Sequence, residues 1–282
     1  MSKHFFPILF SLVSVYSGVS REAGIVKFCV LASGSSGNCA LLATGHTRIL
    51  LDAGLSMREI RNRLAAIGED LGSIDAILVT HEHTDHVAGL PVLARNAHVH
   101  AAIFMTWLTA PAIDWGESQP HLETFQAGAS FTIGNVEVQS FSLPHDAVDP
   151  VGFCFEVEGV RIGVATDLGY IPESVKYHLR RTDLLLLEAN HDLDMLKVGP
   201  YPWSVKQRVM SRVGHLSNLV VSEYLSQDFD SRTAHLVLGH LSEHNNHPEI
   251  VRLVAAQALE QRGLHTRLDI AEQRRPSPVY KF

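Results

Sequence analysis

A His-x-His-x-Asp-His motif at residues 81–86 places four potential metal ligands within six positions. The motif follows an apolar run that predicts a buried strand, and it precedes the predicted start of a helix. His81 and His83 alternate along an extended backbone and therefore project to the same side, whereas Asp85 and His86 enter the turn. The motif can thus supply parts of two metal sites, one of imidazoles only and one that also contains a carboxylate. Imidazole suits zinc and similar metals, and a carboxylate adds affinity for harder ions such as manganese.

The simplest alternative is a histidine-rich surface turn, but three downstream residues favour a metal centre. His145, Asp167 and His240 each come directly after a predicted strand. His145 supplies the third imidazole that the first site lacks, and His240 completes the second site. Asp167 sits where a carboxylate can bridge two metals. Its alternative role is the N-cap of a helix that starts near Pro172.

The 282 residues are enough for one large α/β domain or two small ones. We expect residues 1–25 to be an N-terminal extension and residues 26–282 to form the main domain. The extension has the basic start and short apolar run of a secretory signal peptide. The other interpretation is a mis-assigned start, with the protein beginning near Val26. We favour the second interpretation and a cytoplasmic location, with export as the alternative.

The three cysteines cannot form a disulfide framework without a remainder. Cys29 and Cys154 lie in apolar, strand-like runs and are expected to be packed thiols. This cysteine usage agrees with a reducing compartment.

The formal net charge of −7 excludes a global basic field of the kind that attracts nucleic acid. Residues 195–217 are a local exception, because they contain basic side chains and no Asp or Glu. Tyr201 and Trp203 lie in the same segment, and such a combination suits a polyanion with stackable bases. An ordinary solvated helix face is the alternative. The basic residues of the segment are Lys197, Lys206, Arg208 and Arg212.

Two further features remain open. Residues 33–38 combine two glycines with small polar residues, which predicts either a tight turn or a loop whose amides cradle a phosphate. His98 and His100 form a second His-x-His pair, but no Asp-His follows it, so we expect both to be structural.

Hydrophobic periodicity and turn residues predict an alternation of strands and helices. Ser56 is the expected N-cap of the first helix, with Glu59 completing a capping box. A second helix is expected from the motif to about Arg95. Predicted strands cover residues 26–32, 39–44, 48–51, 74–79, 99–104, 130–133, 136–141, 152–158, 160–166, 183–187, 234–238 and 266–270. Predicted later helices cover 217–225 and 248–261, residues 105–121 are expected to form a helix and a loop, and 274–278 a loop or an edge cover.

Taken together, these residues resemble the metallo-β-lactamase superfamily from about residue 26 to the end. Within it, the chain is most similar to the YycJ (WalJ) group. The motifs that carry the resemblance, besides residues 81–86, are residues 31–39, 144–146, 149–153, 165–169, 187–192, 214–218 and 276–280. The N-terminal extension is a departure, because the family normally lacks one.

The resemblance implies an α/β fold, the four-layer αββα sandwich, with the site at one edge between the sheets. It implies a 5′→3′ exonuclease that acts on DNA, tied to mismatch repair in some bacteria, and a likeness to ribonuclease Z and small-molecule phosphodiesterases. Combined with the spacing, it predicts two divalent metal ions, Zn or Mn, and a metal-bound hydroxide as nucleophile. The expected ligands are His81, His83 and His145 for one ion, Asp85, His86 and His240 for the other, and Asp167 as the bridge.

Further roles are expected for residues around these ligands. Asp85 is expected to double as a proton acceptor, and His215 to contact the phosphate or assist the leaving oxygen. Glu188 is expected to orient His215. The expected substrate-binding residues are Asn38, Ser36, His191, Lys206, Arg208 and Arg212.

Two other functions remain alternatives. One is hydrolysis of a small phosphodiester, thioester, lactam or lactone, because the metal set would be shared. The other is a non-catalytic metal-binding protein, which the complete ligand set disfavours. We expect nucleic acid as the substrate, DNA before RNA, and no stable membrane association. A homodimer is left open.

Overall fold

The computed structural model describes residues 25–282. The predicted N-terminal extension therefore lies, but for its last residue, outside the described residues. Within the described residues, no helix is both long and apolar enough to cross a membrane.

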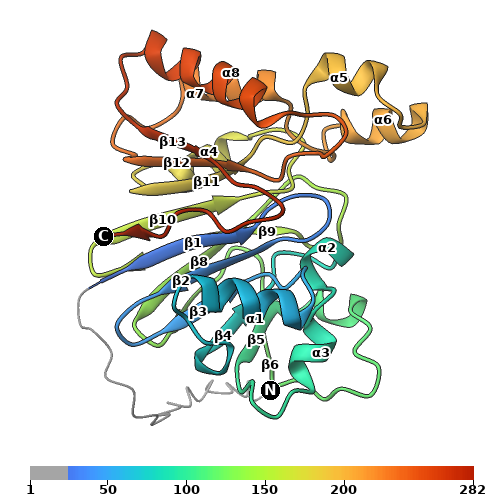
Figure 1. Cartoon of the computed structure of the whole chain (residues 1–282), viewed down its shortest axis with the longest axis vertical. Helices are drawn as coiled ribbons and strands as arrows, with labels where there is room; N and C mark the ends of the chain where they lie inside the picture. The colour runs from blue at the N-terminus through green and yellow to red at the C-terminus, as the bar shows by residue number, and fades with distance from the viewer. Residues whose placement is uncertain (1–24) are drawn as a thin grey trace, which may run out of the picture.

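Two seven-stranded sheets stack face to face, and helices cover the outer side of each (Figure 1). In order across the first sheet lie β14 (Tyr280–Lys281), β1 (Lys27–Ala32), β2 (Cys39–Ala43), β3 (Arg48–Leu51), β4 (Ala76–Leu78), β5 (Ala102–Thr106) and β6 (Leu122–Phe125). In order across the second lie β13 (Arg267–Ile270), β12 (His235–Gly239), β11 (Leu184–Glu188), β10 (Val160–Ala165), β9 (Val151–Val157), β8 (Val136–Ser142) and β7 (Ser130–Ile133). The predicted four-layer αββα sandwich is confirmed.

The helices fall into two groups, one for each sheet (Figure 1). The first group comprises α1 (Met57–Ala66), α2 (Thr84–Val87) and α3 (Leu90–Ala94). The second group comprises α4 (Glu173–Leu179), α5 (Leu193–Val198), α6 (Trp203–Val209), α7 (Asn218–Gln227) and α8 (Pro248–Gln261). Two short 3₁₀ turns are η1 (Leu71–Ser73) and η2 (Ala110–Ala112). Ser56 caps α1 by accepting a hydrogen bond from the Glu59 amide, as predicted.

Three apolar clusters hold the four layers together. The central cluster lies between the sheets and contains Phe28, Phe153 and Phe155, all fully buried. The second packs Ile60 and Leu64 of α1 against the first sheet, and the third packs helices against the second sheet. Strand β1 is buried on both faces, and its successive residues alternate between clusters: Phe28 and Val30 lie in the central one, Cys29 and Leu31 in the one under the helices. The three cysteines are free and buried, which confirms the expectation of packed thiols for Cys29 and Cys154.

Strand direction determines where the polar side chains meet. Strands β3 to β6 are mutually parallel, and so are β10 to β13. The carboxyl ends of parallel strands lie at one edge of a sheet, and loops at that edge commonly carry functional residues. The residues that follow β4, β10, β11 and β12 therefore converge on a single edge of the sandwich.

The predicted single helix from the motif to Arg95 is wrong, because the chain breaks between α2 and α3 at Ala88 and Gly89. Gly89 donates to the Ala53 carbonyl at 2.8 Å, and a Cβ at this position would collide with the Leu55 carbonyl oxygen. Pro91 lies in the first turn of α3, where its missing N–H costs nothing.

Other element boundaries differ from the predicted ones, in part because strand pairing determines where a strand begins. The predicted strand at 99–104 is shifted, because parallel pairing with β4 starts at Ala102. Between 105 and 121 there is no α-helix, only the end of β5 and η2. Two strands were not predicted: β6, which is short and half polar, and β14, which pairs with β1 at the edge of the first sheet.

Candidate metal centre

The His-x-His-x-Asp-His motif runs from the end of β4 into α2. His83 is the N-cap of α2, while Asp85 and His86 occupy its first turns. The rings of His81 and His83 lie edge to face with their centres 4.6 Å apart, so both project to the same place, as the alternation predicts.

Three imidazoles form the first group of potential ligands. His83 Nδ1 lies 3.2 Å from His145 Nε2, and the His81 ring lies 5.1 Å from the His145 ring. His145 Nδ1 lies 3.0 Å from the Gly214 carbonyl oxygen, which makes Nδ1 the donor and leaves Nε2 with a free lone pair. His81 Nε2 is buried and has no hydrogen-bond partner among the described residues. These nitrogens therefore converge on a common point, where their lone pairs could bind a cation.

Asp85, His86 and His240 form the second group. Asp85 Oδ2 lies 3.4 Å from His240 Nε2 and 3.5 Å from His86 Nε2. The opposite ring nitrogens are held by carboxylates: His86 Nδ1 lies 2.8 Å from Asp52 Oδ2, and His240 Nδ1 lies 2.8 Å from Glu188 Oε1. Such outer carboxylates fix the orientation of a metal-binding imidazole.

Asp167 lies between the two groups. One oxygen, Oδ2, is 3.3 Å from His86 Nε2, and the other, Oδ1, is 3.8 Å from His145 Nε2. Oδ2 is buried without a hydrogen-bond partner in the described chain. The alternative role as a helix N-cap is wrong, because Pro172 occupies that position in α4.

Strained backbone conformations accompany these positions. Asp52, Asp167 and His240 have φ values of 59°, 64° and 56°, in the left-handed region that non-glycine residues rarely adopt. Each follows a strand and turns its side chain into the site instead of continuing the strand. Strain of this kind persists only where surrounding contacts impose it, and it gathers at functional sites.

The protonation states suit metal binding. Burial lowers the pKa values of His81 and His145, so both rings are neutral near pH 7 and offer lone pairs. Burial alone would raise the pKa values of Asp85 and Asp167, but the neighbouring histidines, chiefly His240, outweigh it and lower them. His86 and His240 differ: burial would lower their pKa values, but the carboxylates around them, chiefly Asp167, raise both, that of His240 to about 10, so a cation in the second group would displace protons from these rings. The site thus combines the neutral imidazoles of His81 and His145 with ionised carboxylates and orphaned buried atoms, and this donor set fits divalent cations.

Glu188 is fully buried and links the second group to His215. Its Oε1 accepts from His215 Nδ1 at 2.7 Å and from His240 Nδ1, while Oε2 accepts from the amides of Leu168 and Leu216 at 3.1 and 3.0 Å. Burial opposes the charge, but the positive field of His215 and these bonds lower the Glu188 pKa to about 2. Burial would lower the His215 pKa, and the ionised Glu188 reverses this and raises it.

The expected substrate-binding residues are dispersed. Asn38 is inside the site, with Nδ2 3.2 Å from Asp85 Oδ2. His191 is buried near Glu188 and His215, and burial lowers its pKa to about 4. Ser36 is exposed, and its amide donates to Gln273 Oε1.

The basic segment does not present free cations to the site. Lys206 donates to the Lys197 carbonyl at 2.7 Å, Arg208 pairs with Asp146, and Arg212 lies over the Tyr170 ring at 4.1 Å. The hypothesis that these three side chains bind a polyanion stays a prediction.

Sequence reasoning missed Asp52 and Thr80. Thr80 Oγ1 lies within 3.2 Å of Asp52, His81 and His86, so the hydroxyl joins the motif to the end of β3. The available signal was position: Asp52 directly follows β3, the parallel neighbour of the strand that carries the motif.

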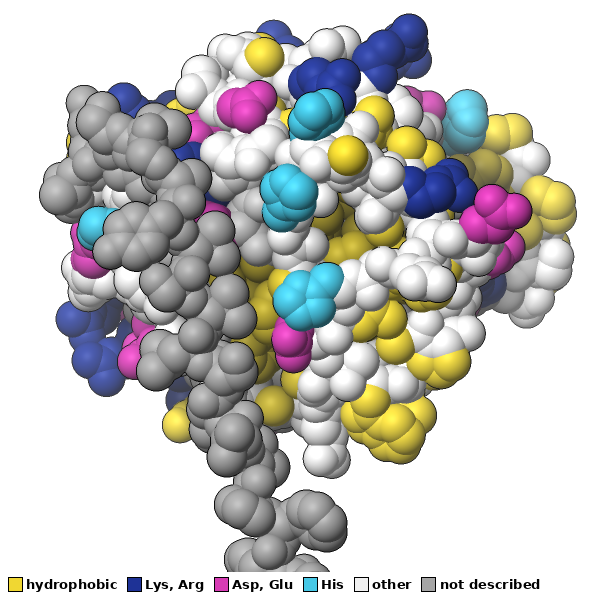
Figure 2. All heavy atoms as spheres, turned by 90° about the horizontal axis from the view of Figure 1, so that it is seen from below, with side chains coloured by type: hydrophobic (Ala, Val, Ile, Leu, Met, Phe, Trp, Pro, Cys, Tyr) yellow, Lys and Arg dark blue, Asp and Glu magenta, His cyan; other side chains and the backbone are white. Residues whose placement is uncertain are grey.

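The second His-x-His pair, His98 and His100, is structurally unlike the first. His98 and His100 are exposed and belong to none of the ligand groups, so they give no second centre. Figure 2 shows the molecule from below, where histidine side chains reach the surface singly, interspersed with apolar and acidic groups.

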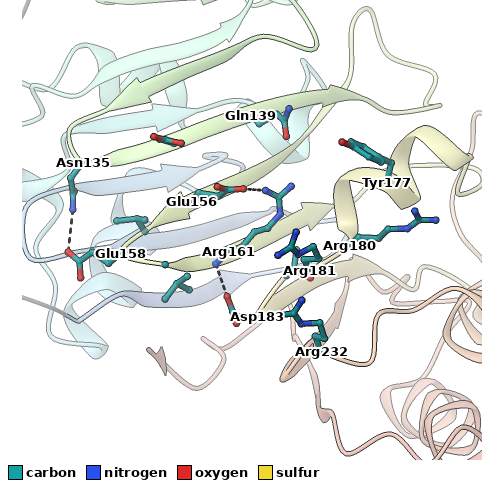
Figure 3. A pocket seen from close by; sticks show the side chains of 15 residues that line it. Asn135, Gln139, Glu156, Glu158, Arg161, Tyr177, Arg180, Arg181, Asp183 and Arg232 are labelled. Carbon is teal, nitrogen blue, oxygen red and sulfur yellow. Dashed lines mark hydrogen bonds and ion pairs between the residues drawn. The ribbon is translucent and has the colours of Figure 1, made fainter.

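A groove of about 1010 Å³ lies at the opposite edge, near the ends of β9 and the starts of β10 and β11 (Figure 3). It is not part of the candidate site. Figure 3 shows Arg180, Arg181 and Arg232 on one side, Glu158 on the other, and Arg161 paired with Glu156 between them. Its charged lining balances, with Arg161, Arg180, Arg181 and Arg232 against Glu137, Glu156, Glu158 and Asp183. A balanced lining gives no net attraction for a polyanion.

Comparison with known proteins gives consistent matches. The family model described as "Beta-lactamase superfamily domain" matches residues 47–240. The exodeoxyribonuclease WalJ of Streptococcus pneumoniae serotype 2 is 38% identical over 248 residues, covering 86% of this chain and 91% of that protein. The exodeoxyribonuclease YycJ of Bacillus anthracis is 35% identical over 239 residues, covering 84% and 90%. The metallo-β-lactamase fold protein YhfI of Bacillus subtilis aligns with a TM-score of 0.68 at 18% identity, covering 91% of this chain and all of that one.

Proposed function

We propose that this chain, a member of the metallo-β-lactamase superfamily and of its WalJ/YycJ exonuclease group, is a 5′→3′ exodeoxyribonuclease. We further propose that it uses a dinuclear metal centre. It is a hydrolase that acts on phosphodiesters, and exonuclease relatives point to a nucleic acid substrate. The observation that carries the finer proposal is the convergence of two ligand groups, with Asp167 between them, beside the Glu188–His215 pair.

In this proposal His81, His83 and His145 hold one divalent ion, and Asp85, His86 and His240 hold the other. Asp167 bridges them. Bound Zn²⁺ or Mn²⁺ would neutralise charge on the non-bridging oxygens and make a deprotonated water available near neutral pH. The buried Asp52 and Glu188 keep His86 and His240 in the required tautomers.

His215 is the proposed general acid. Its Nδ1 is engaged by Glu188, and Nε2 has no hydrogen-bond partner in the described part of the chain. The raised pKa favours the imidazolium near neutral pH. As water oxygen bonds to phosphorus and the P–O3′ bond breaks, His215 gives its proton to the leaving oxygen.

Asp85 is the proposed acceptor of the proton that the attacking water releases. Its lowered pKa keeps it ionised, and its side chain is one-quarter exposed at the mouth of the site. Water and substrate can therefore reach it, unlike the fully enclosed Glu188.

DNA is proposed over RNA because the relatives matched over most of their length carry the name exodeoxyribonuclease. The three free, buried thiols agree with a cytoplasmic site of action.

The test is degradation of a DNA duplex labelled at its 5′ end, by the full-length protein with Mn²⁺ or Zn²⁺. We expect labelled mononucleotides from the wild type and none from Asp85→Ala. Faster release from an RNA of the same sequence would replace the DNA proposal with a ribonuclease. Turnover of only a small phosphodiester or thioester would remove the nuclease role while keeping the hydrolase.

A further inference from the structure

The loop at residues 33–38 does not cradle a phosphate. Most of its amides are already bonded within the protein: Gly34 N to Asn38 Oδ1 at 2.9 Å, Ser36 N to Gln273 Oε1 at 2.9 Å, and Asn38 N to the Asp85 carbonyl at 2.7 Å. Gly37 N donates to the Gly34 carbonyl at 3.2 Å. The loop is instead a built support for one side chain, that of Asn38.

Asn38 is buried and its orientation is fixed. Oδ1 accepts from the Gly34 amide at 2.9 Å and Nδ2 donates to the Gly34 carbonyl at 3.1 Å, so the two bonds to Gly34 hold the side-chain amide in one orientation. Nδ2 lies 3.2 Å from Asp85 Oδ2 and 3.1 Å from His86 Nε2. A single amide therefore touches two of the three proposed ligands of the second ion.

The C-terminal segment holds this loop in place. Gln273 accepts from the Ser36 amide and donates through Nε2 to the Gly37 carbonyl at 2.8 Å. Its own carbonyl accepts from Arg63 Nη1 at 2.9 Å, and the same Nη1 donates to the Leu31 carbonyl at 2.8 Å. Helix α1, the end of β1 and the C-terminal segment are thus fastened together behind Asn38.

We infer that Asn38 is a positioning residue that sets the affinity of the second metal position, and that Gln273 acts on the same position through the loop. The inference rests on the dinuclear centre proposed above. Asp85 is one-quarter exposed, and the described chain gives its Oδ2 only Asn38 and the ring nitrogens of His86 and His240 as contacts. Without the Asn38 amide, Asp85 is free to turn toward solvent, whereas His81 keeps its contact with Thr80 Oγ1 and His145 keeps its contact with the Gly214 carbonyl.

The predicted effect is selective. Loss of an outer partner of a ligand typically weakens metal binding 10- to 100-fold. Asn38→Ala should therefore weaken binding at the second position by about 10- to 100-fold and leave the first position unchanged. A general structural defect would weaken both.

In the experiment, metal-free, full-length protein is titrated with Co²⁺, and binding is measured by calorimetry and by visible absorption. His240→Ala identifies which step belongs to the second position. Asn38→Ala is expected to weaken that step alone, and Gln273→Ala to weaken it less. The matched control is Arg274→Ala, an exposed neighbour without a contact to the loop in the described structure, which should titrate like the wild type.

The outcomes distinguish the dinuclear centre from the role of Asn38. A wild type that binds a single ion would overturn the dinuclear centre, and this inference with it. Two ions in the wild type together with an unchanged second step in Asn38→Ala would overturn the inference alone. If thermal unfolding shows that metal-free Asn38→Ala is not folded, the comparison of Gln273→Ala with Arg274→Ala decides, and equal titrations would refute the role of the loop.

Discussion

Asp52 Oδ2 accepts a hydrogen bond from His86 Nδ1 at 2.8 Å, and both side chains are buried. This contact joins the end of β3 to the metal-binding turn that follows β4. It fixes the tautomer in which Nε2 of His86 faces the second ligand group. A residue that cannot itself reach a metal thus decides whether His86 can bind one.

Replacement of Asp52 by Asn should weaken metal binding about 10- to 100-fold, because the neutral amide orients and polarises His86 less well. Zn²⁺ competition with a chromophoric chelator measures the change. Asp194→Asn, which alters an exposed carboxylate on α5 paired only with Lys197, is the control and should bind like the wild type. Equal affinity in the two variants would contradict the role of Asp52.

Replacement of Asp167 by Ala should abolish nearly all activity, because Asp167 is the carboxylate shared by both ligand groups. Metal analysis of the purified variant should show loss of bound ions along with the loss of turnover. A fully metallated, fully active Asp167→Ala protein is incompatible with a bridging role.

His215→Ala should reduce kcat by about 10²- to 10⁴-fold, the usual contribution of a general acid. The metal content should stay at the wild-type level, since His215 is not among the six terminal ligands or the bridge. The measurement pairs single-turnover rates on 5′-labelled DNA with metal analysis. Parallel loss of metal and activity would make His215 a ligand instead of an acid.

His191 should make the protein less stable in acid. Its pKa is about 4 in the folded protein, mainly because burial disfavours the imidazolium, against a reference value of 6.5. The unfolded chain therefore takes up a proton first as the pH falls, and stability present above pH 6.5 is lost between about pH 6.5 and 4. At 1.36 kcal/mol per pKa unit, the ceiling is about 3 kcal/mol.

Urea unfolding of wild type and His191→Gln at pH 7.5, 6 and 5 measures this effect. The stability difference between the two proteins should shrink or reverse as the pH falls. His265→Gln, at an exposed position, is the matched control and should parallel the wild type. A wild-type-like pH profile for His191→Gln would contradict the prediction.

The sequence by itself determined the chemistry and the fold class. Residues 81–86 contain the side-chain types that bind metals, and the predicted strand ends identify His145, Asp167 and His240 as further ligands. Both signals can be read from the sequence because they depend only on neighbouring residues. The αββα architecture followed from strand and helix alternation together with the resemblance, and the structure has it.

Only the tertiary structure decided which side chains support those ligands. Asp52 at the end of β3 and Thr80, just before the motif, contact His86, and Gln273 of the C-terminal segment holds the loop that carries Asn38. No local pattern reveals such partners. The same holds for Arg208, whose pairing with Asp146 only the structure shows. Residue types determine which ions a site can bind. Which side chains orient the ligands depends on hydrogen bonds between residues that are far apart in the sequence and that only folding brings together.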